Sequence, residues 1–491
     1  MLIRPAVKIA FILPLLFRGA MALAQSQDRF TPTGDMTAQR MGHTATLLTN
    51  GKVLVTGGYA VPAGFPVWAS AELYDPLTGK FALTGSMTTP RAGHTATLLP
   101  DGKVLIAGGF VSNALGSLAN IVATAELYDP FTSTFTATGA MTAPRQGHTA
   151  SLLNNGKVLI TGGQRSDLTT LQSSAEVYDP LTGAFTSTGG MAAARAWHVA
   201  TLLPNGRVLI EGGASCDGQP TPELYDPVAG QFSLTGPSTY PPHGGLSAVS
   251  ASPLPNGNIL TILNVGCDVF SGAELYDAAK GVFTSAAGMS ASRGYTTATL
   301  LAEGSVLIAG RDFDFSHRGG SAELYDPAAG TFTAVDGTPQ REELHTATLL
   351  PDGSVLLAGG WICCGFSVST AEIYHPVHPA PSPVLYSLPG ASQGAILHAG
   401  THEVVSPGNP AVQGEALEMY GAGLIEGGAI PPQVSIGGRL AEVLFFGEAP
   451  GYSGLGQINV RVPSGIAPGP AVPVRLSYLG RSSNEVTVGV K

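Results

Sequence analysis

Short apolar runs separated by glycine and proline turns recur along most of the chain. One unit reads Gly147 to Leu153, Lys157 to Ile160, Ala175 to Pro180 and Phe185 to Thr188. Each run has the length of a β-strand, and none carries the 3.6-residue period of a helix. Asn155-Gly156 predicts a type I′ hairpin between the first two strands, in which both central residues take positive φ. The pattern therefore predicts four antiparallel strands per unit.

This unit is repeated in tandem. The phrase Ala-Glu-Leu-Tyr-Asp-Pro, or a close variant, recurs at intervals of about 50 residues, with its tyrosine at Tyr74, Tyr128, Tyr178, Tyr225, Tyr276, Tyr325 and Tyr374. A unit of this size buries its faces only against its neighbours, so the copies fold as one body. Four-stranded units repeated radially form a β-propeller. The predicted fold class is all-β, with a seven-bladed propeller.

The last copy lacks a recognisable fourth strand, because a proline-rich stretch follows Tyr374. The missing strand is found at the other end of the chain, where Arg29 to Met36 resembles Thr134 to Met141. We therefore expect residues 28–35 to form the outer strand of the seventh blade. Pairing the first and last segments in this way closes a propeller ring.

Beyond the propeller, assigned to residues 25–376, the pattern changes. Residues 377–392 are rich in proline and are interpreted as a linker. Strand-like runs separated by Gly/Pro turns then occur at 415–420, 432–436, 440–446, 456–462, 471–478 and 484–490. They predict a small Ig-like β-sandwich over residues 393–491.

Residues 1–24 have the features of a signal peptide. Arg4 and Lys8 precede an apolar run from Ile9 to Phe17, and Ala22-Leu-Ala24 fits a signal-peptidase site. We expect the mature protein to be secreted, at the cell surface or in the periplasm. No later run is long and apolar enough to suggest insertion into a membrane.

Composition narrows the choice of partners. Charged residues make up only 12% of the chain, against about 25% in an average protein. The net charge is −10, and lysines and arginines do not cluster. Nucleic-acid binding needs a basic surface, so a nucleic-acid partner is excluded. We expect a monomer.

The four cysteines fall in loops that follow the second strand of a blade. Cys216 and Cys267 lie in corresponding loops of blades four and five, and they are candidates for a disulfide in an oxidising compartment. Cys363 and Cys364 are adjacent, so they form a vicinal disulfide or remain thiols. Their spacing gives no zinc signature. We therefore predict neither a metal nor a cofactor.

The order Arg-x-Gly-His-Thr, Gly-Gly, Glu-x-Tyr-Asp-Pro and Phe resembles the kelch motif. The stretches Gly414 to Leu424 and Gly454 to Pro463 resemble an Ig-like, IPT/TIG-type domain. Together the two parts resemble galactose oxidase and its relatives. That resemblance implies a copper-ligand tyrosine at Tyr295 and a Tyr-His pair in the last blade. The chain instead reads Glu343-Leu344-His345, so the ligand set of a copper-radical oxidase is not present.

Polar residues that recur in most blades are interpreted as scaffold, because a residue at equivalent sites is expected to make the same local hydrogen bonds in each blade. These are the histidines His43, His94, His148, His198 and His345, the arginines Arg40, Arg91, Arg145, Arg195, Arg293 and Arg341, and the glutamates Glu72, Glu126, Glu176, Glu223, Glu274, Glu323 and Glu372. A buried carboxylate needs a partner, so these Glu and Arg are expected to pair.

Function is expected where the copies differ. The loops before strand one and after strand two open at the same end of the propeller. Their candidate ligand-binding residues are Trp68, Trp197, Tyr295, Arg311, Asp312, Asp314 and Trp361. The residue before the repeat histidine is glycine in three blades but Trp197, Tyr295 or Leu344 in others. These side chains either line the mouth of the central channel or fill a hole left by blade asymmetry.

Two functions remain open on the sequence. Aromatic side chains mixed with charged groups suit a carbohydrate or a protein ligand, which favours a secreted, non-catalytic binding protein. The alternative is an extracellular enzyme on the same face, either galactose-oxidase-like or a glycoside hydrolase using acids such as Asp312 and Asp314. No catalytic residue is assigned.

Overall fold

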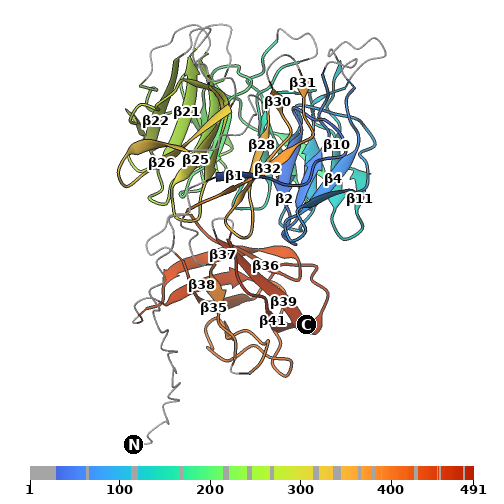
Figure 1. Cartoon of the computed structure of the whole chain (residues 1–491). Helices are drawn as coiled ribbons and strands as arrows, with labels where there is room; N and C mark the ends of the chain where they lie inside the picture. Colours follow the sequence, from blue (N-terminus) through green and yellow to red (C-terminus); the bar gives the residue numbers. More distant parts are fainter. Residues whose placement is uncertain are drawn as a thin grey trace, which may run out of the picture.

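The computed structural model describes residues 29–61, 66–111, 120–165, 170–213, 220–239, 246–265, 270–312, 320–335, 344–362, 366–377, 382–388, 390–424, 430–450, 452, 455–478 and 481–491. In these ranges the chain forms a seven-bladed β-propeller and, below it in Figure 1, a smaller all-β domain at the C-terminus. The described residues include no helix of the length and apolar character needed to cross a membrane.

Each blade is a four-stranded antiparallel sheet. Blade 1 contains β2 (Thr44–Leu47), β3 (Val53–Thr56), β4 (Ala71–Asp75) and β5 (Lys80–Leu83). Blade 2 contains β6 (Thr95–Leu98), β7 (Val104–Ala107), β10 (Ala125–Asp129) and β11 (Thr134–Ala137), with a small hairpin of β8 (Phe110–Val111) and β9 (Asn120–Ile121). Blade 3 contains β12 (Thr149–Leu152), β13 (Val158–Thr161), β14 (Ala175–Asp179) and β15 (Ala184–Ser187).

The next three blades follow the same order. Blade 4 contains β16 (Val199–Leu202), β17 (Val208–Glu211), β18 (Glu223–Asp226) and β19 (Gln231–Leu234). Blade 5 contains β20 (Leu246–Pro253), β21 (Ile259–Val265), β22 (Phe270–Asp277) and β23 (Val282–Ser285). Blade 6 contains β24 (Arg293–Leu300), β25 (Val306–Asp312), β26 (Gly320–Asp326) and β27 (Thr331–Val335).

Blade 7 joins the two ends of the propeller. It contains β28 (Thr346–Leu349), β29 (Val355–Ala358), β32 (Ala371–His375) and a small hairpin of β30 (Trp361–Ile362) and β31 (Phe366–Ser367). Its outer strand is β1 (Arg29–Pro32), which runs antiparallel to β32 with Phe30 opposite Tyr374. The first strand of each blade contacts that of the next, and β28 contacts β2. The ring is thus closed by a strand from the beginning of the chain.

Hydrophobic packing between blades explains why the second strand of most units begins with three apolar residues. Strand β13 is fully buried, because its sheet is covered on both faces by neighbouring blades. Val158, Ile160 and Tyr178 of blade 3 pack with Leu105 and Ala107 of blade 2. Each interface of this kind holds one shared apolar cluster, so a single blade has no complete core of its own.

The turn between the first two strands differs from the predicted type I′. Gly156 has a φ of 80°, whereas Asn155 is not among the residues with positive φ. The N–H of Gly156 donates to the carbonyl of Leu153 over 2.9 Å, and the Asn155 side chain accepts from the N–H of Lys157 over 3.1 Å. Only the glycine therefore takes the left-handed conformation, as in longer hairpin loops with a glycine bulge.

Buried Arg–Glu pairs link the start of a blade to its third strand, as predicted. They are Arg40–Glu72, Arg91–Glu126, Arg145–Glu176, Arg195–Glu223 and Arg293–Glu323. In blade 3 both partners are almost fully buried, and the Arg145 guanidinium also donates to the carbonyls of Gly162 and Ser174. Arg341 lies outside the described residues. The pairs neutralise a charge that burial would otherwise make costly.

The repeat histidines and tyrosines connect neighbouring blades. The Nε2 of His198 lies 3.0 Å from the hydroxyl of Thr149 and 2.9 Å from that of Thr161, both in the preceding blade. Burial, together with nearby Arg195, lowers the pKa of His198 to about 3, so its ring is neutral at physiological pH. Tyr178 shares a 2.9 Å hydrogen bond with Thr138, which follows the outer strand of blade 2. These histidines therefore serve as scaffold.

Blades 5 and 6 have longer inner strands than the others. The glycine pair that ends strand two elsewhere, such as Gly57-Gly58 with φ of 62° and 87°, is replaced by Leu263-Asn264 and Gly310-Arg311. Without two left-handed residues the strand continues, because extended pairing is not interrupted. In Figure 1 the two blades carry the labels β21, β22, β25 and β26.

The C-terminal domain is a nearly closed barrel with a sandwich-like core. Its strands are β33 (Val384–Leu385), β34 (Ile396–His398), β35 (Ala416–Ala422), β36 (Gln433–Ile436), β37 (Arg439–Glu448), β38 (Gly456–Arg461), β39 (Gly469–Tyr478), β40 (Arg481–Ser482) and β41 (Val486–Val490). The long strand β37 pairs with β36 through its first half and with β38 through its second. Because one strand serves both halves, the sheet is continuous rather than split into two separate layers.

Candidate functional site

The residue before the repeat histidine, or before Thr296 at the same place in blade 6, has a left-handed backbone in six blades. Gly42, Gly93 and Gly147 have φ of 60–61°, and Trp197, Tyr295 and Leu344 have φ of 55°, 50° and 55°. An L side chain in this conformation costs about 1–2 kcal/mol relative to glycine. Trp197 and Tyr295 nevertheless stand there with 48% and 47% of their surface exposed. Three blades thus carry a large side chain at a backbone position that favours glycine.

Aromatic side chains cover the glycine positions of this ring. A β-carbon on Gly42 would lie 3.2 Å from the ring of Tyr59, and one on Gly93 would lie 3.5 Å from the ring of Phe110. Tyr59 and Phe110 in turn meet edge to face, with centroids 5.5 Å apart. Aromatic groups of adjacent blades therefore pack over these glycine positions, and Phe110 is almost fully buried there.

Trp197 reaches over the blade that precedes its own. A β-carbon on Gly147 would lie 2.8 Å from the indole nitrogen of Trp197, so only glycine leaves room for the indole. The backbone N–H of Trp197 donates to the carbonyl of Gly147 over 2.7 Å. The equivalent bond in blades 1 and 2 joins Gly93 to Gly42. Backbone hydrogen bonds between blades therefore position Trp197.

Tyr295 lies in an irregular part of blade 6. Strands β24 and β25 shift register between Gly294 and Thr297, and Gly294 is opposite Arg311. A bulge of this kind redirects the side chain at the irregularity and is common next to binding sites. Tyr295 thus lies near the start of β24, and Arg311 near the end of β25.

The remaining predicted ligand-binding residues are spread around the same end. The indole N–H of Trp68 donates to the carbonyl of Gln39 over 3.0 Å, so this group is used within the fold. Trp361 begins β30, whose partner strand β31 bonds through the Ser367 hydroxyl to the N–H of Val61 in blade 1. Asp312 ends β25. Asp314 and the four cysteines, Cys216, Cys267, Cys363 and Cys364, lie outside the described residues.

The donor set does not fit the copper site that the resemblance to galactose oxidase implies. Leu344 has no donor atom, and the Nε2 of His345 lies 3.2 Å from the hydroxyl of Thr297. In the C-terminal domain, His398 and His402 are paired with Glu415 and Glu418. Among the described residues, no three His, Cys, Asp or Glu are grouped to hold a metal ion.

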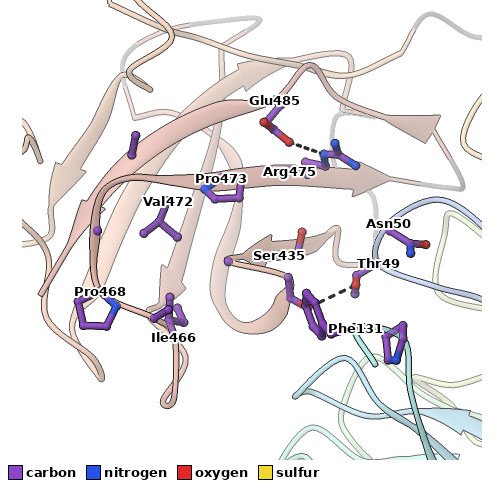
Figure 2. Close-up of a pocket in the computed structure, with 16 residues that line it drawn as sticks. Thr49, Asn50, Phe131, Ser435, Ile466, Pro468, Val472, Pro473, Arg475 and Glu485 are labelled. Carbon is purple, nitrogen blue, oxygen red and sulfur yellow. Dashed lines mark hydrogen bonds and ion pairs between the residues drawn. The ribbon is translucent and has the colours of Figure 1, made fainter. Parts of the chain in front are cut away.

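A concave region lies at the opposite end of the propeller, between blades 1 and 2 and the C-terminal domain. It has a volume of about 500 Å³ and is lined mainly by Phe131, Ile466, Val472, Pro468 and Pro473 (Figure 2). The Arg475–Glu485 ion pair at its edge is nearly half exposed on both sides. None of the residues predicted to bind a ligand lines it. A 2.7 Å hydrogen bond from Leu440 to Pro100 ties the two domains together beside it.

The described fold defines a seven-bladed β-propeller, and a Kelch motif matches residues 147–192. A solved structure of a fungal alcohol oxidase of the AA5 family, in complex with copper, is similar over 94% of this chain and 100% of that chain. It has a TM-score of 0.59 and 17% sequence identity. At this identity the similarity shows the fold alone. No curated protein sequence matches the chain.

Proposed function

We propose that this protein is a secreted, non-catalytic binding protein that takes a carbohydrate at the mouth of the propeller channel. The observation that carries the proposal is the placement of Trp197 and Tyr295, two half-exposed aromatic side chains at left-handed positions where other blades have glycine. Strained residues of this kind cluster at ligand sites, where binding offsets their cost. The signal-like segment at residues 1–24 supports an extracellular location.

A carbohydrate suits this surface for chemical reasons. The flat faces of indole and phenol rings offer large apolar areas with a polar edge, which suits ligands that are partly apolar and partly wet. Arg311 adds a charged group near Tyr295. Tyr59 of blade 1 packs on the buried Phe110 of blade 2. The absence of a fitting copper donor set in the described residues favours binding over oxidation.

Trp197→Gly is expected to lower the affinity for the carbohydrate at least about tenfold while leaving thermal stability close to that of wild type. Glycine avoids the cost of an L side chain at this backbone position, and this gain compensates for removing the packing of the indole against Gly147. A glycan array identifies the ligand, and titration calorimetry measures the change in affinity. Tyr295→Gly is expected to act in the same direction.

Leu181→Ala is the matched control, since Leu181 is 91% exposed and lies in the turn between strands three and four, at the other end of its blade. It should change neither affinity nor stability. Unchanged carbohydrate binding in both glycine variants would contradict the proposed site. Release of reducing ends from a bound glycan, lost in Asp312→Asn, would show an enzyme instead. A failed glycan array followed by tight binding of a protein to the same face would assign a protein ligand.

A further inference from the structure

Blade 5 departs from the repeat at two scaffold positions. Residues 235–249, which precede and begin its first strand, contain no arginine to match the Arg of the buried pairs, and Val249 occupies the position of the repeat histidine. The third-strand glutamate, Glu274, is still present and fully buried. Blade 5 therefore keeps a buried carboxylate without the cation that accompanies its counterparts in five other blades.

The preceding blade places a second carboxyl group, that of Glu211, next to Glu274, because Glu211 is bonded to Thr261 and Thr261 lies directly opposite Glu274 in the sheet. Glu211 ends β17, where the other blades have Thr, Ala or Ile. Its side chain is fully buried, and its Oε2 accepts a 2.8 Å hydrogen bond from the Thr261 hydroxyl of blade 5. Its Oε1 has no hydrogen-bond partner among the described residues. In blade 3, Thr161 occupies the position of Glu211, and its hydroxyl is hydrogen-bonded to His198 of the next blade. Glu211 thus crosses the interface where the histidine is missing.

The hydrogen-bond donors around the two groups are unequal. Glu274 accepts from the Ser238 hydroxyl over 2.7 Å and from both the backbone N–H and the hydroxyl of Thr239, over 2.8 and 2.9 Å. Within the described part of the chain, Glu211 accepts only from Thr261. A carboxylate with three donors is favoured in its ionised form, whereas one with a single donor is not. When both are ionised, neither can donate to the other.

We propose that Glu211 and Glu274 hold one proton between them across the interface of blades 4 and 5, carried on Glu211, and that this proton makes the ring more stable in acid than in alkali. With the proton on Oε1, Glu211 donates to Glu274, so that this oxygen gains the hydrogen-bond partner that it otherwise lacks. Two buried like charges would otherwise face each other at an interface that the closed ring cannot relax.

Arg195 and His198 are the basic groups that face the pair from blade 4. On the blade 4 side, Arg195 is bonded to Glu223 over 2.6 Å, and the pKa of His198 is lowered to about 3, so that histidine brings no charge. Burial, followed by the neighbouring Glu274, raises the pKa of Glu211 well above its usual value, while the Thr261 hydrogen bond and the charge of Arg195 act in the opposite direction. His243, in the segment that precedes the first strand of blade 5, lies outside the described residues.

The direction of the pH effect follows from linkage. A carboxyl whose pKa is raised on folding binds its proton more tightly in the folded state. Its contribution to stability is therefore complete below the unfolded pKa of about 4.3 and is lost as pH rises through the folded pKa. One such group changes the unfolding equilibrium constant by at most about tenfold per pH unit. Glutamine at position 211 removes the titration but can still donate to Glu274 and accept from Thr261.

The test is urea unfolding of the full chain at several pH values between about 5 and 9. In wild type the unfolding equilibrium constant should rise with pH by up to about tenfold per pH unit because of Glu211, and Glu211→Gln should lack this rise. The variant should therefore be the more stable protein at alkaline pH. Infrared spectra should show a protonated carboxylic acid at neutral pH in wild type that is missing in the variant.

Two controls separate this proposal from its alternatives. Glu176→Gln, which removes the carboxylate of an equivalent buried pair in blade 3, should destabilise at every pH without changing the slope. A pH profile of Glu211→Gln identical to that of wild type would overturn the proposal. So would a slope removed by His243→Gln instead, or a wild-type stability that falls when EDTA is added, since the pair would then hold a histidine or a cation.

Discussion

Replacing Arg145 with alanine is expected to lower the free energy of unfolding by about 3–5 kcal/mol, because it leaves Glu176 buried and ionised without a cation. The guanidinium is fully buried and donates to Glu176, to the Ser174 hydroxyl and to the carbonyls of Gly162 and Ser174. Each of these acceptors would lose a partner that water cannot replace. Urea unfolding followed by tryptophan fluorescence measures the loss.

An exposed ion pair in the same blade serves as the control for the buried Arg145–Glu176 pair. Lys157 and Asp179 form an ion pair at 3.0 Å, but their side chains are 43% and 22% exposed. Lys157→Ala should cost less than about 1 kcal/mol, since exposed pairs contribute little. Glu176→Gln should approach the cost of Arg145→Ala. If Arg145→Ala unfolded within about 1 kcal/mol of wild type, the repeat Arg–Glu pairs would not be structural, and loss of ligand binding in a fully stable variant would point to a functional role.

Deleting residues 25–36 is expected to lower the free energy of unfolding by about 5 kcal/mol or more. The deletion removes β1 from blade 7, the Phe30 ring 5.3 Å from that of Tyr374, and Met36, which is almost fully buried in the cluster between blades 7 and 1. Loss of a buried methionine side chain alone costs about 2–5 kcal/mol. Differential scanning calorimetry of the mature chain measures the fall in melting temperature.

A shorter deletion distinguishes the loss of ring closure from the mere shortening of the chain. Removal of residues 1–28 leaves β1 intact, so its melting temperature should match that of the mature protein. The longer deletion should also expose the edge of β32 and increase aggregation, because an unpaired strand edge pairs readily with other chains. A melting curve unchanged by the longer deletion would show that β1 does not hold the ring closed.

The candidate site was only partly accessible from sequence. The replacement of glycine by Trp197, Tyr295 and Leu344 is visible in an alignment of the seven copies, but their left-handed backbone and exposure are not. Trp68 belongs to the same loops, yet its indole N–H bonds the carbonyl of Gln39. Loop composition identifies which residues differ, whereas the direction of each side chain depends on packing against other blades.

Glu211, at a buried position, is also a residue that the sequence marks as unusual but whose contacts only the structure reveals. It is a charged residue where the copies otherwise have Thr, Ala or Ile, so the repeat alone marks it as unusual. Its partner Glu274 is 63 residues further along the chain. Glu274 occupies the repeat position at which other blades have a glutamate that pairs with arginine. Only the packing of β17 against blade 5 brings the two carboxyl groups together, through Thr261, which bonds Glu211 and lies opposite Glu274.

The sequence by itself determined the strand order within a blade, the recurrence of that blade and the pairing of repeat Glu with repeat Arg. Those features are local or are copied in every unit, so the spacing of residues along the chain carries them. The tertiary structure alone decided which loop side chains stay exposed, how far the strands of blades 5 and 6 extend, and how one strand, β37, turns the C-terminal sheet into a nearly closed barrel. These outcomes depend on interactions between residues far apart in the chain, where neighbouring blades and strands limit the space and backbone conformation available to each side chain.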